Sequence, residues 1–178
     1  MTRLMNVILL GYRGCGKTTL GKRMADQLWS TFVDTDDLVR KRFNGDSIAT
    51  IWQQHGEDQW RLVEAQVTAE RCQADQQVIA LGGGAVMHPD ARRALEQAPH
   101  AVRIYLYCQP EELHRRIQTD PQTSMTRPNL TPLGGGVDEI REVLDPRDPV
   151  YRAIADRVFD VTHVQPEQAV RYIVEKCL

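Results

Sequence analysis

A glycine-rich loop after a short apolar run constrains the fold of this chain more than any other feature. Residues 11–18 read GYRGCGKT and directly follow the apolar segment Val7-Ile8-Leu9-Leu10. A strand that ends in glycines lets backbone N–H groups surround a phosphate, and a helix that begins near Lys17 points its positive end at the same place. Lys17 is expected to reach the β- and γ-phosphates, and the Thr18 hydroxyl to ligate Mg²⁺. A chance glycine turn is the alternative, but the pattern predicts a nucleoside triphosphate site.

Bulk composition narrows the class of protein. The 178 residues fit a single domain, and 22 Lys and Arg stand against 24 Asp and Glu. This balance argues against non-specific binding to nucleic acid or membranes. No leader pattern is found, and no apolar stretch approaches the ~20 residues of a membrane span. We therefore expect a cytoplasmic protein that is soluble.

The four cysteines show no paired spacing. Cys15, Cys72, Cys108 and Cys177 are scattered along the chain, so reduced thiols are expected rather than a disulfide or zinc framework. Cys15 stands beside the phosphate loop, where a thiol pKa can be lowered, although a small side chain tolerated in the loop is the simpler interpretation.

Short apolar runs alternate with amphipathic stretches, which predicts an α/β fold with a parallel sheet wrapped by helices. The five predicted strands are Asn6–Leu10, Thr31–Asp34, Val78–Leu81, Val102–Tyr107 and Val158–Val161. Leu20, Met24 and Leu28 recur every four residues, so 18–28 is predicted to be a helix that packs on the sheet. No repeat or change in composition marks a boundary, so residues 1–178 are treated as one domain.

Several helix signals follow the second strand. Asp46-Ser47 offers an N-cap, and a helix over 57–73 carries Leu62, Ala65 and Ala69 on one side. Three prolines stand at plausible first helical positions: Pro89, Pro110 and Pro166.

The segment Thr119–Gly136 interrupts this alternation. It is polar, contains three prolines and ends in three glycines. A long loop without periodicity is either disordered or a functional lid, and phosphoryl transfer requires the exclusion of water. We expect a mobile lid at about 119–136, with Arg127 able to reach the γ-phosphate in the transition state.

Two carboxylates close the second strand. Asp34 and Asp36 alternate, so in an extended chain both point to the same side at the carboxyl edge of the sheet. One could hold Mg²⁺ near Thr18 through a water, and the other could bind substrate hydroxyls. An aspartate-rich turn that caps the next helix is an equally common role for such residues.

Three further motifs are candidates for a second substrate. Gly82-Gly83-Gly84 follows a strand and would allow a ligand to touch the main chain. Arg147 lies just after the helix predicted to follow the lid and could grip a carboxylate with two N–H groups. Arg61 lies on a helix with Glu57 and Glu64, where a solvated arginine paired with either is the default.

Taken in order along the chain, these motifs resemble the shikimate kinase family. The specific part is the series Asp34-x-Asp36, Gly56-Glu57-x-x-Trp60-Arg61-x-x-Glu64, Gly82-Gly83-Gly84, Arg127-Pro128 and Arg147-x-Pro149-x-Tyr151. The resemblance implies a P-loop fold like that of nucleoside-monophosphate kinases, with a five-stranded parallel sheet of order 2-3-1-4-5. It also implies transfer of the ATP γ-phosphate to the 3-hydroxyl of shikimate, in the pathway to chorismate and aromatic amino acids, by a monomer.

The resemblance also assigns roles to residues. Lys17, Asp36 and Arg127 would be catalytic, with Asp36 accepting the proton of the reacting hydroxyl, and Thr18 and Asp34 would hold Mg²⁺. The residues implied for ATP are Gly11, Gly14, Cys15, Gly16, Lys17, Thr18, Thr19, Arg116, Arg127 and Pro166. The substrate-binding region is expected at about 34–61. The residues implied for shikimate are Asp36, Arg61, Gly82, Gly83, Gly84 and Arg147.

Two rival functions remain open from the sequence. A gluconate kinase of the same fold would also need arginines and an aspartate, although the Trp60-Arg61-x-x-Glu64 helix and the Gly82–Gly84 turn disfavour it. A regulatory module that binds ATP without catalysis would be expected to have lost Lys17, Asp36 or Arg127, and all three are present.

Overall fold

The computed structural model describes residues 5–120, 134 and 136–178. Five parallel strands form one sheet in the order β2-β3-β1-β4-β5, as the sequence predicted. The strands are β1 (Asn6–Leu10), β2 (Thr31–Asp34), β3 (Gln77–Ala80), β4 (Ala101–Tyr107) and β5 (Arg157–Asp160). Each predicted strand is found within one residue of its expected bounds, because short apolar runs between helical segments are a strong signal for buried parallel strands.

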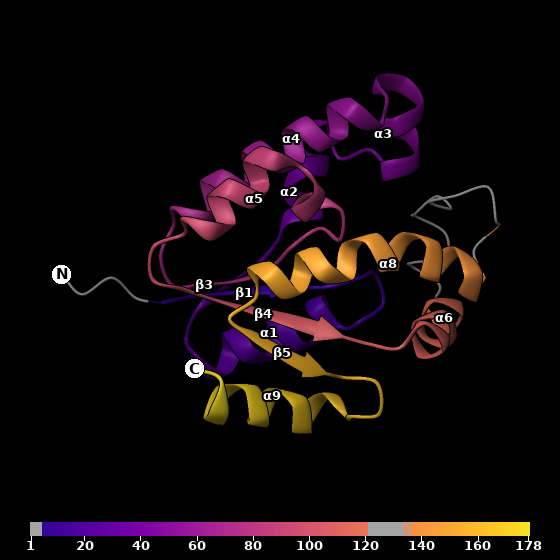
Figure 1. The fold of residues 1–178 in the computed structure, drawn as a ribbon. Coiled ribbons are helices and arrows are strands. Elements are labelled where there is room, and N and C mark those ends of the chain that lie inside the picture. Colours follow the sequence, from indigo (N-terminus) through magenta and orange to yellow (C-terminus); the bar gives the residue numbers. More distant parts are fainter. Residues whose placement is uncertain (1–4, 121–133, 135) are drawn as a thin grey trace.

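Helices cover both faces of this sheet (Figure 1). The helices are α1 (Lys17–Gln27), α2 (Thr35–Arg42), α3 (Ile48–His55), α4 (Glu57–Cys72), α5 (Pro89–Glu96), α6 (Pro110–Thr119), α8 (Val137–Ile154) and α9 (Pro166–Lys176), with a short 3₁₀ turn η1 (Ala85–Met87). Helices α1 and α9 pack on one face, whereas α5 and α8 cover the other and α4 lies against α5. The three prolines expected at helix starts all occupy the first turn, of α5, α6 and α9.

The central strand of the sheet is buried within the main core. Residues Val7–Leu10 of β1 are at most 2% exposed, which fits a central strand covered on both faces. Neighbouring strands run in register, with Val7 opposite Val78 of β3 and Val102 of β4. The loops after β1, β2 and β3 therefore emerge together at the carboxyl edge, where open α/β sheets bind ligands.

A second, smaller hydrophobic core lies between helices α2, α3 and α4. It is formed by Val39, Ile51, Trp60, Val63 and Val67. This packing corrects the predicted face of α4. Leu62 is 44% exposed, and the helix is instead buried through its Trp60, Val63 and Val67 face.

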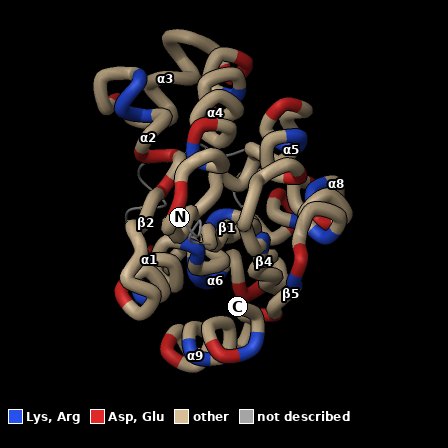
Figure 2. The backbone as a smooth tube through the Cα atoms, turned by 90° about the vertical axis from the view of Figure 1, so that its left-hand side faces the viewer, with Lys and Arg blue, Asp and Glu red and all other residues tan. Residues whose placement is uncertain are grey.

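The surface carries both charge signs. Acidic and basic residues are interspersed along the outer helices (Figure 2). Over the described residues, no helix is both long and apolar enough to span a lipid bilayer. The four cysteines are all free, as expected, and only Cys177 is not fully buried.

Candidate functional site

The loop between β1 and α1 has the backbone shape that phosphate binding requires. Gly11, Gly14 and Gly16 have φ of 141°, 82° and 103°, and Gly16 is the N-cap of α1. A Cβ at Gly11 would lie 2.7 Å from the Leu106 carbonyl oxygen, so only glycine fits there. The backbone N–H groups of the first turn of α1 can therefore face an anion.

Lys17 folds back over this loop. Its Nζ donates hydrogen bonds to the carbonyl oxygens of Gly11 at 2.7 Å and Tyr12 at 2.9 Å. The ammonium is thus held at the mouth of the loop by the loop itself. The Cys15 side chain is 1% exposed, with its Sγ 3.8 Å from Lys17 Nζ, so the small buried side chain expected in the loop is what the structure shows.

A cavity of about 720 Å³, hereafter the larger cavity, opens in front of the loop. Its lining includes the loop residues 13–20, Asp34, Asp36, Arg116 of α6 and the segment 161–166 before and at the start of α9. Arg116 and Pro166, which are 50 residues apart in the sequence, therefore face the same space. Of the predicted ATP-binding residues that the structure describes, all but Gly11 line this cavity.

Arg116 is fixed in place by neighbouring groups. It donates to Glu112 Oε1 at 2.7 Å and to the carbonyl oxygens of Val161 at 2.8 Å and Thr162 at 3.2 Å. Hydrogen bonds from Arg115, together with those from Arg116, lower the pKa of Glu112 to about 2. The guanidinium thus ties α6 to the loop that precedes α9, across the larger cavity.

Asp34 caps helix α2 and also contacts Thr18. Its Oδ2 accepts a hydrogen bond from Thr18 Oγ1 at 3.0 Å, and its Oδ1 accepts one from the backbone N–H of Asp36 at 3.1 Å as the N-cap of α2. A carboxylate and a hydroxyl that meet beside a phosphate loop fit Mg²⁺, which takes few protein ligands and keeps phosphate oxygens and waters. In the described part of the chain, no group of three or more His, Cys, Asp or Glu residues could hold a metal ion alone.

Asp36 belongs to a helix and not to an extended segment. Helix α2 begins at Thr35, so strand alternation does not set the direction of the Asp36 side chain, and that part of the sequence argument was wrong. Asp36 nevertheless lines the larger cavity and also a second, smaller cavity. It therefore stands where the two meet.

The smaller cavity is assembled from six separate parts of the chain. It is lined by Tyr12, Arg13, Asp36, Ile48, Trp52, Trp60, Arg61, Glu64, Gly83, Gly84 and Arg147. Three arginines on its wall make it suited to an anionic ligand. The structure thus brings together Asp36, Arg61, Arg147 and two of the three predicted glycines; Gly82 adjoins them without lining the cavity.

Arg61 is held by two carboxylates of its own helix. Its Nη1 donates to Glu64 at 2.9 Å, while its Nε and Nη2 donate to Glu57 Oε1 at 3.1 and 2.7 Å. Its Cζ lies 5.6 Å from the centroid of the Trp52 ring. The pairing with Glu57 and Glu64 therefore occurs as the sequence suggested, and it fixes the guanidinium at the cavity wall instead of in solvent.

Glu64 is a buried acid that was not singled out as a site residue. Its side chain is 1% exposed. Burial raises the pKa of Glu64, Arg61 opposes the rise, and the negative charge of Asp36 adds to it. The sequence held a signal, because Glu64 follows Arg61 by one helical turn, but that spacing does not show burial.

The Gly82–Gly84 turn is required for space and not for backbone freedom. None of the three glycines has a positive φ, contrary to the expected reason for them. A Cβ at Gly82 would collide with Glu64 and lie 2.5 Å from Asp36 Oδ1, and a Cβ at Gly84 would collide with the Arg61 guanidinium. The turn is held by Thr35 Oγ1, which accepts from the Gly82 N–H at 2.8 Å.

Arg147 lies inside α8, whereas the sequence placed it after a helix. Pro146 and Pro149 flank it, and the helix continues through both to Ile154. Within α8, Arg147 Nη1 and the Tyr151 hydroxyl both donate to the carbonyl oxygen of Gly83, the first at 3.3 Å. The helix therefore holds the middle glycine of the turn.

Arg13 was also missed as a candidate. It lines both cavities, and its Nη2 donates to Glu139 Oε1 of α8 at 2.9 Å, with side-chain exposures of 10% and 0%. Variable positions inside a glycine loop give no sequence signal of their own. The predicted lid and Arg127 fall mainly on residues 121–133 and 135, which lie outside the described residues.

Comparison with known proteins adds a family to this geometry. The family model for shikimate kinase matches residues 13–178. A curated shikimate kinase of Nitrosococcus oceani is 36% identical over 165 residues, which cover 93% of this chain and 82% of that protein. Shikimate kinase 2 of Yersinia enterocolitica is 36% identical over 170 residues, covering 94% and 92% of the two chains.

Solved structures give the same result. Shikimate kinase from Acinetobacter baumannii in complex with shikimate superposes with a TM-score of 0.87 and 28% identity, covering 97% of this chain and 92% of that one. Shikimate kinase from Aquifex aeolicus superposes with a TM-score of 0.75 and 27% identity, covering 96% and 95%.

Proposed function

The chain belongs to the shikimate kinase family, and from this premise we propose how its residues phosphorylate shikimate with ATP. The observation that carries the assignment of residues is the position of Asp36. It lines both the larger cavity, which holds the phosphate loop, and the smaller cavity, which holds three arginines. A phosphoryl donor and an anionic acceptor would therefore meet at this carboxylate.

ATP would occupy the larger cavity. The N–H groups of the Gly11–Gly16 turn and the first turn of α1 would bind its phosphates, with Thr19 completing that turn. Lys17 would exchange its two carbonyl partners for phosphate oxygens. Arg116 and Pro166 would enclose the adenine, since both line this cavity.

Thr18 and Asp34 would hold Mg²⁺ beside the phosphates. Their oxygen atoms meet at 3.0 Å, and hydroxyl and carboxylate oxygens are hard ligands that suit this ion. When bound, the ion neutralises the charge that builds up on the phosphate oxygens.

Shikimate would occupy the smaller cavity. Arg61 and Arg147 would bind its carboxylate, and Gly82, Gly83 and Gly84 would present their main chain to its ring. Arg61 is pre-oriented by Glu57 and Glu64, and Arg147 lies beside the Gly83 carbonyl, so little side-chain entropy remains to be lost on binding.

The reaction would be an in-line transfer. The 3-hydroxyl oxygen forms a bond to the γ-phosphorus, the bond from that phosphorus to the β–γ bridging oxygen breaks, and the proton of the hydroxyl passes to Asp36. Because such a transfer is achieved mainly by positioning and charge stabilisation, two cavities with a shared carboxylate are a sufficient framework. Arg127, which lies outside the described residues, would add positive charge at the γ-phosphate.

We further propose a single P-loop kinase domain over residues 1–178, with a lid at about 119–136. The protein would act in the cytoplasm as a monomer, without nucleic acid or membrane partners. Support comes from the near balance of 22 basic and 24 acidic residues and from the absence of a membrane-spanning helix in the described part.

The test is ADP release that depends on ATP and Mg²⁺, measured with shikimate, gluconate, quinate or no acceptor. Strong stimulation by shikimate alone is expected. Stimulation by gluconate would preserve the kinase fold but overturn the assigned acceptor site. ATP binding without stimulation by any acceptor would instead identify a module that binds nucleotide without catalysis.

A further inference from the structure

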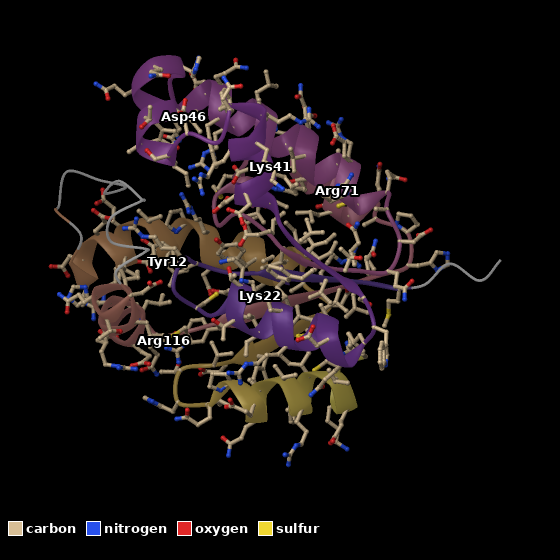
Figure 3. The ribbon with its side chains drawn as sticks, turned by 180° about the vertical axis from the view of Figure 1, so that it is seen from behind. Tyr12, Lys22, Lys41, Asp46, Arg71 and Arg116 are labelled. Atoms are coloured by element: carbon tan, nitrogen blue, oxygen red, sulfur yellow. The ribbon has the colours of Figure 1, made fainter. Side chains whose placement is uncertain are left out.

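Tyr12 occupies an unusual place in the phosphate loop. Its carbonyl oxygen accepts at 2.9 Å from Lys17, which lines the larger cavity, while Tyr12 itself lines the smaller cavity. Figure 3 labels Tyr12 at the end of the molecule where α6 and the start of α8 lie, as expected for a residue just after β1. Tyr12 therefore connects a residue of the larger cavity with the wall of the smaller one.

The Tyr12 hydroxyl is buried and unsatisfied. The residue is 1% exposed, and within the described residues its hydroxyl makes no hydrogen bond of good geometry, although the neighbouring Arg13 side chain is close enough to lower its pKa. A buried polar group without a partner destabilises a fold, and such groups are rare. The other two large buried tyrosines differ, because Tyr105 donates to Asp148 at 2.8 Å and Tyr151 donates to the Gly83 carbonyl.

The charges around this hydroxyl suit an anion. Burial raises the pKa of Tyr12 above its ordinary value, with Glu139 adding to the rise and Arg13 and Arg147 opposing it. The phenol is therefore neutral at physiological pH and keeps its proton to donate. Arg13 is already hydrogen-bonded to Glu139. Arg147 is therefore the positively charged residue of the cavity wall that can bind a ligand together with Tyr12.

We propose that the Tyr12 hydroxyl donates a hydrogen bond to the carboxylate of the acceptor substrate, alongside Arg147. This inference rests on the proposed function, because it takes shikimate as the occupant of the smaller cavity. A carboxylate offers about four acceptor positions, and Arg61 has committed three of its five N–H groups to Glu57 and Glu64. A further donor beside Arg147 therefore finds an acceptor, and Tyr12 acts as a specificity-determining residue for an acidic substrate.

The test is Tyr12→Phe in the full chain, which keeps the ring and removes only the hydroxyl. The shikimate KM should rise about tenfold, the size expected for a hydrogen bond to a charged group, while the ATP KM and kcat stay near the parent values. The melting temperature should stay the same or rise, because an unsatisfied buried hydroxyl is gone. Tyr172→Phe, on the exposed face of α9, serves as the matched control and should change neither constant.

A substrate analogue identifies the group contacted. The cyclohexene triol that lacks the carboxylate should be used equally poorly by the parent chain and by Tyr12→Phe. An equal loss for shikimate and for the triol would overturn the carboxylate assignment.

Two further outcomes would also overturn the proposal. One is an unchanged shikimate KM in Tyr12→Phe. The other is a lower melting temperature with both KM values raised, which would indicate a packing role. Failure of the proposed function is a separate result, since it would appear as an absence of shikimate-dependent turnover in the parent chain.

Discussion

The two cavities meet at Asp36, yet the chain builds them in different ways. The wall that the glycine-rich loop gives to the larger cavity comes from the consecutive residues Arg13–Leu20, and Lys17 there is held by backbone carbonyl groups. The smaller cavity draws its wall from six separate segments, and two of its arginines, Arg13 and Arg61, are held by carboxylates. A backbone site is set by local chain geometry, whereas a side-chain site depends on packing between distant elements.

This difference predicts where substitutions act. A change at the shared carboxylate should damage the chemistry, a change in the loop should damage the use of ATP, and a change in the assembled wall should damage the acceptor alone. The expected effects below run from the largest to the smallest.

Asp36→Asn should have the largest effect, because it removes the proton acceptor where the cavities meet. We expect kcat to fall about 10²–10⁴-fold, the range for loss of a general base, with ATP affinity little changed. Steady-state ADP release and an ATP titration by calorimetry measure the two quantities. A kcat within threefold of the parent value would show that another group takes the proton.

Lys17→Ala tests the phosphate loop of the larger cavity. Loss of one positioned donor to the transferring phosphate should lower kcat by about 10²–10³-fold, while circular dichroism shows an unchanged fold. Lys41→Ala, at an exposed position of α2, is the control for a lost lysine. Near-full activity of Lys17→Ala would contradict the phosphate-loop assignment.

Arg147→Ala tests the wall of the smaller cavity. The shikimate KM should rise about 10- to 100-fold through loss of a charge-assisted contact, with a small effect on the ATP KM. Arg152 lies on the same helix, lines no part of the smaller cavity and pairs with Asp148 at 2.7 Å, so Arg152→Ala is the matched control. Equal KM shifts for both substrates would mean that α8 supports the whole site and not the acceptor alone.

Glu64→Gln tests the buried charge in the wall of the smaller cavity, through the pH dependence of the free energy of unfolding. Because burial raises the pKa of Glu64, the folded state binds more protons than the unfolded state between the ordinary carboxyl pKa and neutrality. The contribution of Glu64 to the free energy of unfolding therefore falls as the pH rises from the ordinary carboxyl pKa towards neutrality, by at most about 1.4 kcal/mol per pH unit.

The measurement is the difference in unfolding free energy between the parent chain and Glu64→Gln at several pH values. The variant should gain relative stability as pH rises. Glu57→Gln is the comparison variant, because it removes the other carboxylate partner of Arg61 at a side chain that is 51% exposed. A pH-independent difference for Glu64→Gln would mean that Glu64 is ionised throughout.

Ser47→Ala should have the smallest effect. Ser47 Oγ accepts from the Thr50 N–H at 3.1 Å as the N-cap of α3, and loss of such a cap costs about 1 kcal/mol. Helix α3 carries Ile48 and Trp52 of the smaller cavity, so the shikimate KM should rise slightly and the ATP KM should not. A shift in the ATP KM alone would contradict the separation of the two cavities.

The same contrast explains what the sequence could predict. The loop, the five strands, the cap at Ser47 and the proline helix starts all follow from local patterns, and each was found where expected. Local patterns fail where packing decides. The apolar face of α4 was misread because Leu62 fits the helical spacing, whereas the second core selects Trp60, Val63 and Val67.

The other error was the placement of Arg147 after a helix. Helix α8 packs against α6, η1 and β4 and stays helical through Arg147 despite Pro146 and Pro149. Tertiary contacts there outweigh the lost backbone hydrogen bonds. Burial of Glu64 and Tyr12 could not be read from the sequence either, because both depend on contacts between segments far apart in the chain.

The lack of a Cβ atom at the glycines of the Gly82–Gly84 turn affects which amino-acid substitutions this protein can accept. A methyl group at Gly82 would displace Glu64 and Asp36, and one at Gly84 would displace Arg61. These positions are therefore strongly epistatic: an alanine in the turn would have the effect of altering the acid or the arginine it pushes aside. A library aimed at a new acceptor should vary the turn and these three charged residues as one block, since one-at-a-time scanning would discard every intermediate.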